Sequence, residues 1–349
     1  MSVKVECLLK NATTTIGESP HWDESSRCLF YVDIQSNDVH RWNSVTGKDD
    51  KIHFDGHVGF VVPCSKDGFI IGLETRLCHY DMGTKKTTFL YEVDKGTRHR
   101  FNDAKCDPKG RLWAGTIGFV HTIKVPLSVE DTGHLYSLET NGSLRKHLDD
   151  INISNGMAWT RDTKTMYYID TIPRKVYAFD FDIEAGKISI TKAESCNYDY
   201  VYIGNKKIAV DLAVKPIEEY GYPDGMTIDV EDMIWVAGLC SHKIFRFNPK
   251  TGISIQHIYQ CKFNFFGISK FKKVPFVLYE LREEISSIKF PTPQITSCCF
   301  GGKNFDELYV TSAAETTKEG KKKYPLSGSI FKVTGLGVKG LPAPLCLKV

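Results

Sequence analysis

The 349-residue sequence has no apolar run close to the roughly 18 residues that a membrane-spanning helix requires. It also lacks a basic N-terminal segment followed by an apolar one, which is the pattern of a secretory signal. Its 11 cysteines are odd in number and include no CxxC pair or other metal-binding spacing. These absences predict a cytoplasmic protein with reduced thiols and no membrane partner.

A large excess of charge of one sign is missing as well. Lys and Arg total 45, and Asp and Glu total 42, which gives a net charge of +3. This excess is too small for a protein that neutralises many phosphates, so we expect no nucleic-acid partner. Long segments with a 3.6-residue apolar period are also scarce, which argues against a helical fold.

The sequence does contain an internal repeat. The segment HWDESSRCLFYVD, beginning at His21, aligns without a gap with AWTRDTKTMYYID, beginning at Ala158. A looser pattern of a short strand, a polar turn and a second apolar strand recurs around six anchor residues, which are Trp22, Cys64, Cys106, Trp159, Ile228 and Phe300. Turn residues at intervals of roughly 8–12 positions between alternating apolar strands are typical of an all-β fold.

Six units of about four strands each predict a six-bladed β-propeller. Two β-sandwich domains are the alternative, but six near-equal units fit that arrangement poorly. No Pro-, Gly- or Ser-rich linker divides the chain, so we expect residues 1–349 to form one domain. Propellers remove an unpaired sheet edge by completing the last blade with a strand from the other chain end. We therefore predict that Val3–Leu8 pairs beside Gly328–Thr334.

The first residues of the innermost strands of a propeller surround one mouth of its central channel. The residues four positions before the anchors are Glu18, Phe60, Asn102, Asn155, Asp224 and Thr296. Two carboxylates and two carboxamides around one axis are costly to bury without a counter-charge, whereas a hard divalent cation binds six or more such oxygens. These positions hold no His or Cys, which argues against a dedicated zinc site. Spacing alone leaves open that the polar residues only cap turns.

Several longer motifs carry a resemblance to a known family. The motifs GESPHWD, RFNDAKCDPKGR, SNGMAW, YPDGMTID, TSCCFGGKN and FKVTGLGVKG occur in this order along nearly the whole chain. Together they resemble the regucalcin family, also called senescence marker protein 30, which includes beetle luciferin-regenerating enzymes and bacterial gluconolactonases. The resemblance implies a six-bladed propeller with one divalent metal in its channel, and metal-dependent hydrolysis of lactones or related esters.

The resemblance also implies roles for individual residues. The implied metal ligands are Glu18, Asn155 and Asp224, and Asp224 would also be the general base. The implied substrate contacts are Arg100 and Asn102, with Asp103 in support. We expect calcium as the cation, with zinc, manganese or magnesium as alternatives. The expected partner is a small lactone or ester, and the expected state is a monomer.

The sequence departs from the family pattern in two places. Phe119 and Val120 stand where vertebrate sugar lactonases look as if they carry acidic residues, which makes this side of the pocket apolar. The segments 197–217 and 261–285 are longer than usual, and we interpret them as extra loops at blade edges, with a translated intron as the alternative for the second. A luciferin-regenerating type of enzyme with a non-sugar substrate therefore stays open. So does a non-catalytic calcium-binding regulatory protein, although the presence of Arg100 and Asn102 favours an enzyme.

Overall fold

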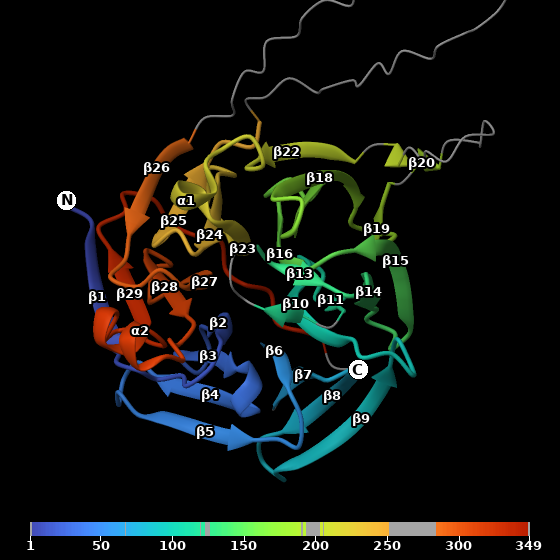
Figure 1. The fold of residues 1–349 in the computed structure, drawn as a ribbon. Coiled ribbons are helices and arrows are strands. Elements are labelled where there is room, and N and C mark those ends of the chain that lie inside the picture. The colour runs from blue at the N-terminus through green and yellow to red at the C-terminus, as the bar shows by residue number, and fades with distance from the viewer. Residues whose placement is uncertain are drawn as a thin grey trace, which may run out of the picture.

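The computed structural model describes residues 2–66, 68–118, 120–122, 126–189, 191–192, 203–204, 206–250 and 284–347. Antiparallel sheets stand around a central axis like the blades of a propeller (Figure 1). The prediction of an all-β, six-bladed propeller is confirmed. Of the segment 261–285, which we interpreted as a loop insertion or a translated intron, residues 261–283 lie outside the described residues, and the last two residues begin a strand of blade 5.

The first three blades follow one another along the chain. Blade 1 consists of β2 (Gly17–Asp23), β3 (Cys28–Asp33), β4 (Asp38–Asn43) and β5 (Asp49–His53). Blade 2 consists of β6 (Val58–Pro63), β7 (Phe69–Leu73), β8 (Arg76–Asp81) and β9 (Lys86–Glu92). Blade 3 consists of β10 (Arg100–Cys106), β11 (Leu112–Ile117), β14 (Gly133–Leu138) and β15 (Leu144–Ile151).

The other three blades complete the ring. Blade 4 contains β16 (Ser154–Trp159), β17 (Thr165–Asp170), β18 (Lys175–Asp182), β19 (Lys187–Ile188) and β22 (Lys207–Asp211). Blade 5 contains β23 (Tyr222–Ile228), β24 (Ile234–Leu239), β25 (Lys243–Phe247) and β26 (Glu284–Lys289). Blade 6 contains β27 (Ile295–Gly301), β28 (Glu307–Ser312), β29 (Ile330–Thr334) and β1 (Lys4–Leu9).

The predicted closure of the ring is confirmed. Strand β1 pairs antiparallel with β29, with Lys4 opposite Thr334 and Cys7 opposite Phe331. The N-terminal strand therefore covers the outer edge of blade 6, whose other three strands come from the C-terminal part of the chain.

Blade 4 differs from a simple four-stranded unit. Strand β22 lies within the long segment 197–217 that we had expected to be a blade-edge loop, and it pairs with β18 as an outer strand. The short β19 also pairs with β18, but only through two residue pairs, so most of this edge is left for β22 to cover. The segment thus supplies part of the sheet as well as loop.

The remaining elements are short. Strands β12 (Val120–Thr122) and β13 (Ser128–Val129) form a ribbon between β11 and β14, and β20 (Thr191–Lys192) pairs with β21 (Ile203–Gly204). The helices are η1 (Ile34–Ser36), α1 (Ile217–Tyr220) and α2 (Lys318–Lys323). Within the described ranges no helix has the length and apolar character needed to cross a membrane.

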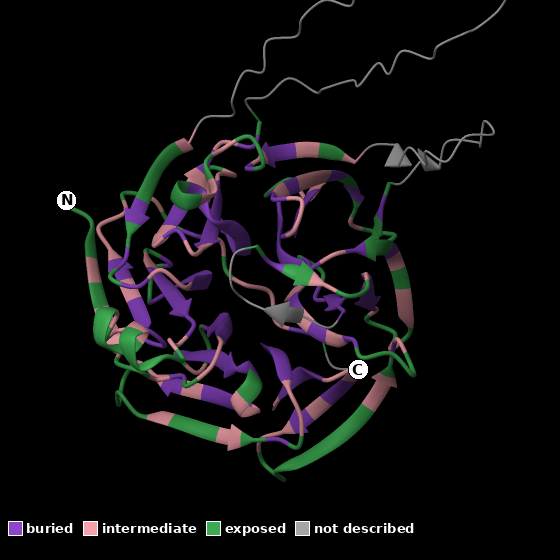
Figure 2. Cartoon of the chain, viewed as in Figure 1, coloured by how far each residue is buried: buried purple, intermediate pink, exposed green. Residues whose placement is uncertain are grey.

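The hydrophobic core lies between neighbouring blades. One cluster joins Phe30 and Val32 of blade 1 to Val61 and Ile71 of blade 2, and equivalent clusters fill the other junctions. Because both faces of an inner strand are covered, five of the six inner strands are buried at every residue. Figure 2 shows this burial near the axis and exposure at the rim. The exception is β10, in which Arg100, Asn102 and Lys105 are partly exposed.

Candidate functional site

A pocket at one mouth of the channel brings together residues from separate blades. Its polar lining includes five of the predicted site residues, namely Glu18, Arg100, Asn102, Asn155 and Asp224. The sixth, Asp103, does not line this pocket but is buried beside it, since its charge acts on both Glu18 and Asp224. The inner strands therefore place all six predicted residues around one end of the axis.

Each inner strand carries a β-bulge or register shift at this end. The shifts fall between Glu18 and His21, between Phe101 and Ala104, between Ser154 and Met157, and between Pro223 and Met226, with equivalents in β6 and β27. A bulge adds an unpaired residue and turns side chains away from their regular alternation. The polar residues lie at these irregular positions, so the bulges direct them toward the channel.

Two glycines in the motifs allow the inner strands to approach one another closely. A Cβ atom on Gly156 would lie 2.4 Å from the backbone nitrogen of Met226, and one on Gly225 would lie 1.9 Å from Oγ of Ser297. No side chain fits at either position without moving its neighbour. The glycines of SNGM and PDGM therefore keep Asn155 and Asp224 close to the axis.

Three buried carboxyl groups lie close together at the mouth. Burial raises the pKa of Glu18 well above its usual value, and the charges of Asp224 and Asp103 raise it further. Burial and the charge of Asp103 likewise raise the pKa of Asp224, although hydrogen bonds from Asn155 and Glu18 and the charge of Arg100 oppose the shift. Burial also raises the pKa of Asp103, against the charge of Lys105. Ionised together, these carboxylates repel one another, and a bound cation would relieve the repulsion.

Asn155 offers an oxygen to the same place. Its Nδ2 donates to Oγ1 of Thr171 at 3.0 Å, and that hydroxyl donates its own proton to the carbonyl oxygen of Pro223 at 2.8 Å. Because Thr171 can then only accept from Asn155, the orientation of the amide is fixed. Its Oδ1 is buried and has no hydrogen-bond partner among the described residues. An unpartnered amide oxygen beside buried carboxyls is the donor set that a hard cation requires, so these residues fit a calcium-like ion.

Arg100 and Asn102 form a rigid pair at the rim. Nη1 of Arg100 donates to Oδ1 of Asn102 and to the carbonyl oxygen of Phe101, both at 2.8 Å. Nδ2 of Asn102 donates to the carbonyl oxygen of Ser154 at 2.8 Å, which ties blade 3 to blade 4. Burial lowers the pKa of Arg100 to about 10, against the charges of Glu74, Glu18 and Asp224, so the guanidinium stays charged near neutral pH.

Asp103 has a different place from Arg100 and Asn102. Its Oδ1 accepts a hydrogen bond from the backbone nitrogen of Ala104 at 2.8 Å. Among the described residues, no hydrogen bond joins its carboxylate to Arg100 or Asn102. Its predicted supporting role therefore has to act through the charge it places beside Glu18 and Asp224.

Most of the remaining lining of the mouth is apolar, apart from Thr171, Gln294 and Thr296. Its apolar lining residues are Ile16, Ile34, Ile117, Leu127, Ile153, Leu239 and Ala313. Leu127 comes from the connection between β11 and β14, and its backbone nitrogen donates to the hydroxyl of Tyr222 at 3.2 Å. Figure 1 shows β13 of the same connection in front of the inner strands. Phe119 lies outside the described residues, and Val120 is described only as the start of β12.

Comparison with known proteins agrees with this geometry. The family described as SMP-30/Gluconolactonase/LRE-like region matches residues 16–262 and 274–314. The chain belongs to this family. Regucalcin of Danio rerio is 36% identical over 342 residues, covering 98% of this chain and 97% of the relative.

Solved structures of this family share the fold. A luciferin-regenerating enzyme is similar with a TM-score of 0.78 and 29% identity, covering 99% of this chain and all of that chain (100%). A calcium-binding protein, regucalcin, from Agrobacterium tumefaciens has a TM-score of 0.74 at 22% identity, covering 96% of this chain and 95% of that chain. The family predicted from the motifs is therefore confirmed. Its members carry different names, so family membership alone leaves the reaction open.

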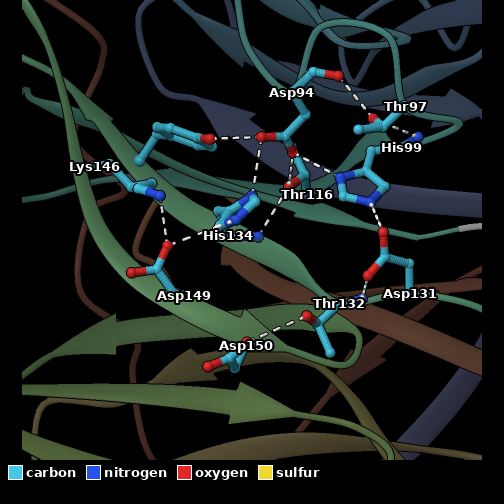
Figure 3. A network of polar contacts seen from close by, with 11 residues as sticks. Asp94, Thr97, His99, Thr116, Asp131, Thr132, His134, Lys146, Asp149 and Asp150 are labelled. Carbon is cyan, nitrogen blue, oxygen red and sulfur yellow. Dashed lines mark hydrogen bonds and ion pairs between the residues drawn. The ribbon is translucent and has the colours of Figure 1, made fainter.

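The structure contains a second group of potential metal ligands that the sequence did not predict. Ligand atoms of Asp94, His99 and His134 lie within 4.8 Å of one another. Asp94 and His99 lie in the connection between β9 and β10, and His134 lies on β14, so two separate segments meet (Figure 3). His134 is far from Asp94 and His99 in the sequence, so the fold and not a short motif brings the three residues together.

Hydrogen bonds already occupy this second group. The carboxylate of Asp94 accepts from the hydroxyls of Thr116 and Tyr136, both at 2.6 Å, and from Nδ1 of His99 at 2.9 Å. Nδ1 of His134 lies 2.9 Å from its Oδ1. Burial alone would raise the pKa of Asp94, but the hydrogen bonds outweigh it and lower the pKa to about 2.

The outer nitrogens of the two histidines face further carboxylates. Nε2 of His99 is 3.3 Å from Asp131, and Nε2 of His134 is 3.6 Å from Asp149 (Figure 3). A metal could bind to Asp94 only by displacing the hydroxyl and imidazole groups that already contact its carboxylate. The group therefore acts as a polar network that fastens the β11–β14 connection, which carries Leu127, to the start of β10.

Proposed function

We propose that the protein is a divalent-cation-dependent hydrolase of the lactonase type, with calcium as the favoured cation. The observation that carries the proposal is the convergence of three buried carboxyl groups and the unpartnered Oδ1 of Asn155 on one channel mouth. In this proposal Glu18, Asn155 and Asp224 hold the cation. The neighbouring apolar lining and the Arg100–Asn102 pair give the same mouth a place for an organic substrate.

The proposed reaction adds water to a lactone and gives a hydroxy acid. A bound divalent cation would polarise the carbonyl group and stabilise the negative charge that develops on its oxygen. Asp224 takes one proton from the attacking water as the water oxygen bonds to the carbonyl carbon. The ring C–O bond then breaks, and the departing oxygen receives the proton back from Asp224. Arg100 and Asn102 orient the substrate, and the contacts that hold this pair together keep that geometry fixed.

Two further candidates have specific support. The Agrobacterium relative is described as a calcium-binding protein, which supports a non-catalytic calcium-binding role. The apolar side chains at the mouth, which include Ile117 and Leu127, support a substrate that is less polar than a sugar lactone. A luciferin-regenerating type of activity on a non-sugar substrate is consistent with this lining.

A panel of substrates separates these candidates. Sugar lactones, aliphatic lactones and aryl esters would be assayed with calcium, zinc, manganese or magnesium, and with EDTA. The proposal expects hydrolysis that EDTA abolishes and calcium restores, with aliphatic lactones preferred over sugar lactones. Calcium binding measured by calorimetry without turnover on any substrate would instead establish the non-catalytic role.

Variants of Asp224 test the base. Asp224→Ala removes both an oxygen donor and a proton acceptor, so calcium affinity and turnover should be lost together. Asp224→Asn keeps an oxygen donor but cannot accept the proton, so turnover should fall far more than calcium occupancy at saturating calcium. Asn102→Ala serves as the control that mainly lowers kcat/KM and leaves calcium binding intact. Near-normal turnover of Asp224→Asn with calcium bound would eliminate Asp224 as the base.

We also propose that the protein works as a monomer in a reducing compartment such as the cytoplasm. The nine cysteines within the described ranges carry free thiols, which supports the second part of this proposal.

A further inference from the structure

The channel has a second cavity at the end opposite the mouth, which we call the lower cavity. Its walls come from the C-terminal ends of the inner strands, including His21, Lys105, Trp159 and Ile228, whereas the mouth is lined by the beginnings of the same strands. The C-terminal segment 341–344 forms the remaining wall.

Backbone contacts hold the C-terminal segment in place below the inner strands. Gly340 pairs with Asp229 after β23, and Cys346 pairs with Cys64 after β6. The segment therefore spans from blade 5 to blade 2, and it lies behind the inner strands in Figure 1. This cavity is a built feature of the fold, with walls from five inner strands and the C-terminal segment.

Two buried nitrogens in the walls of the lower cavity have no hydrogen-bond partner within the described part of the chain. They are Nε2 of His21 and Nε1 of Trp159, whose residues are 4% and 5% exposed. The indole nitrogen can only donate. Buried polar groups in native proteins are nearly always paired, so two unpartnered nitrogens on residues that line one cavity favour a ligand that can accept a hydrogen bond from the indole.

Lys105 gives the lower cavity a positive charge. Its Nζ donates to the carbonyl oxygen of Met226 at 2.6 Å, and an ammonium group has three protons to donate. Burial and the charge of Lys105 lower the pKa of His21 to about 3, so the imidazole is neutral, and the tautomer with its proton on Nε2 can donate to a ligand. One ammonium, one indole and one neutral imidazole together favour an anionic acceptor over a neutral one.

The remaining walls select for an organic anion. Phe300, Ile228, Leu341 and Pro342 surround the polar groups with apolar surface. An inorganic oxyanion would leave this surface without a partner, whereas a carboxylate with a short apolar tail would contact both kinds of wall. We propose that the lower cavity binds a small monocarboxylate, with its carboxylate on Lys105, His21 and Trp159 and its tail on the apolar walls. This site is separate from the proposed hydrolytic mouth and does not depend on it.

Calorimetry with sodium butyrate on the full chain in EDTA tests the proposal, because EDTA removes any cation that could hold a carboxylate at the mouth. Butyrate should bind, and neutral butyramide should bind at least about tenfold more weakly. Lys105→Met should weaken butyrate binding by about tenfold or more. Trp159→Phe, which removes only the indole N–H and keeps an aromatic ring, should weaken it about threefold or more.

Arg100→Met is the matched control, because it removes the positively charged guanidinium group at the opposite end of the channel. Butyrate affinity that falls in Arg100→Met and not in Lys105→Met would place butyrate at the mouth and overturn the proposal. So would the absence of butyrate binding, or equal affinity in the wild type and Trp159→Phe. Inorganic phosphate that binds more tightly than butyrate would replace the organic anion with an inorganic one and overturn the proposed ligand class. None of these results bears on the proposed calcium-dependent hydrolysis, which is measured in a separate assay.

Discussion

Replacing Asp94 with asparagine tests how strongly one buried carboxylate holds blade 3 together. Its side chain is 3% exposed and accepts hydrogen bonds from the hydroxyls of Thr116 and Tyr136 and from Nδ1 of His99. Nδ1 of His134 lies 2.9 Å from the same carboxylate. An asparagine at this position has one oxygen and one NH2 group. The NH2 group would face hydrogen-bond donors where the wild type has a carboxylate oxygen. The negative charge beside the imidazoles of His99 and His134 would also be lost. We therefore expect Asp94→Asn to fold but to be clearly less stable.

The pKa of Asp94 sets the magnitude. Hydrogen bonds overcome the opposing effect of burial and lower this pKa from 3.8 to about 2. A shift of this size corresponds to about 2 kcal/mol of stability. Because the pKa is lower in the folded state, the contribution is complete well above pH 4 and is lost as the pH falls toward 2, with about half gone near pH 3. One newly unpaired buried group adds about 1–2 kcal/mol, so the total loss near pH 7 is about 3–4 kcal/mol.

Urea unfolding of the wild type and Asp94→Asn from pH 7 down to pH 3 measures this dependence. The difference in unfolding free energy between the two proteins should shrink as the pH falls. Asp131→Asn is the matched control, since that carboxylate also touches His99 but is 68% exposed, and it should change stability little. A difference that does not vary with pH, or a loss as small as that of Asp131→Asn, would refute the assignment of Asp94 as the centre of the network.

Three further predictions concern the channel and the ring. In EDTA near pH 7, Glu18→Gln should unfold at an equal or higher urea concentration than the wild type, because a carboxyl whose pKa is raised by folding destabilises the fold at pH values above its usual pKa. The same variant should lose most of the stabilisation that calcium gives the wild type. A Glu18→Gln protein that is less stable than the wild type in EDTA would contradict the expected effect of this carboxyl. Thr171→Val should leave folding intact but weaken calcium binding roughly fivefold, because the Asn155 amide loses the acceptor that orients it. An unchanged calcium affinity in calorimetry would rule out this orienting role of Thr171. Deleting residues 2–9 should lower the thermal unfolding midpoint and expose β29 to aggregation measurable by light scattering, whereas wild-type behaviour would mean that β1 is dispensable.

The repeat was enough to predict the ring and its closure. Turn residues and alternating apolar strands mark the inner strands of all six blades, because each strand must be apolar where two neighbouring blades cover it. The β-rich character of Val3–Leu8 predicted the strand observed as Lys4–Leu9, since propellers complete the last blade with a strand from the other chain end. Strand β22 was not predicted, because its residues lie in a segment that matches no repeat unit and its pairing with β18 is a tertiary event.

The candidate site was predicted in part, for the same reason. Equivalent positions in the repeat pointed to Glu18, Asn102, Asn155 and Asp224, and the structure places these residues around one mouth. The Asp94 network could not be predicted, because Asp94 and His99 come from the β9–β10 connection and His134 comes from β14, and no local pattern connects these two segments. The lower cavity is of the same kind, since residues 341–344 form a wall only after the chain has closed the ring.

The bulges explain how one short stretch of each strand can supply so much chemistry. In a regular strand, successive side chains point to opposite faces, so Asn102 and Asp103 could not both serve one channel. The register shift between Phe101 and Ala104 breaks that alternation, and Asn102 then lines the mouth while the charge of Asp103 acts on Glu18 and Asp224. Beyond the shift, regular pairing resumes at Ala104, and Lys105 reaches the lower cavity. A single strand thus contributes to both ends of the channel, with negative charge at the proposed cation site and positive charge at the proposed carboxylate site.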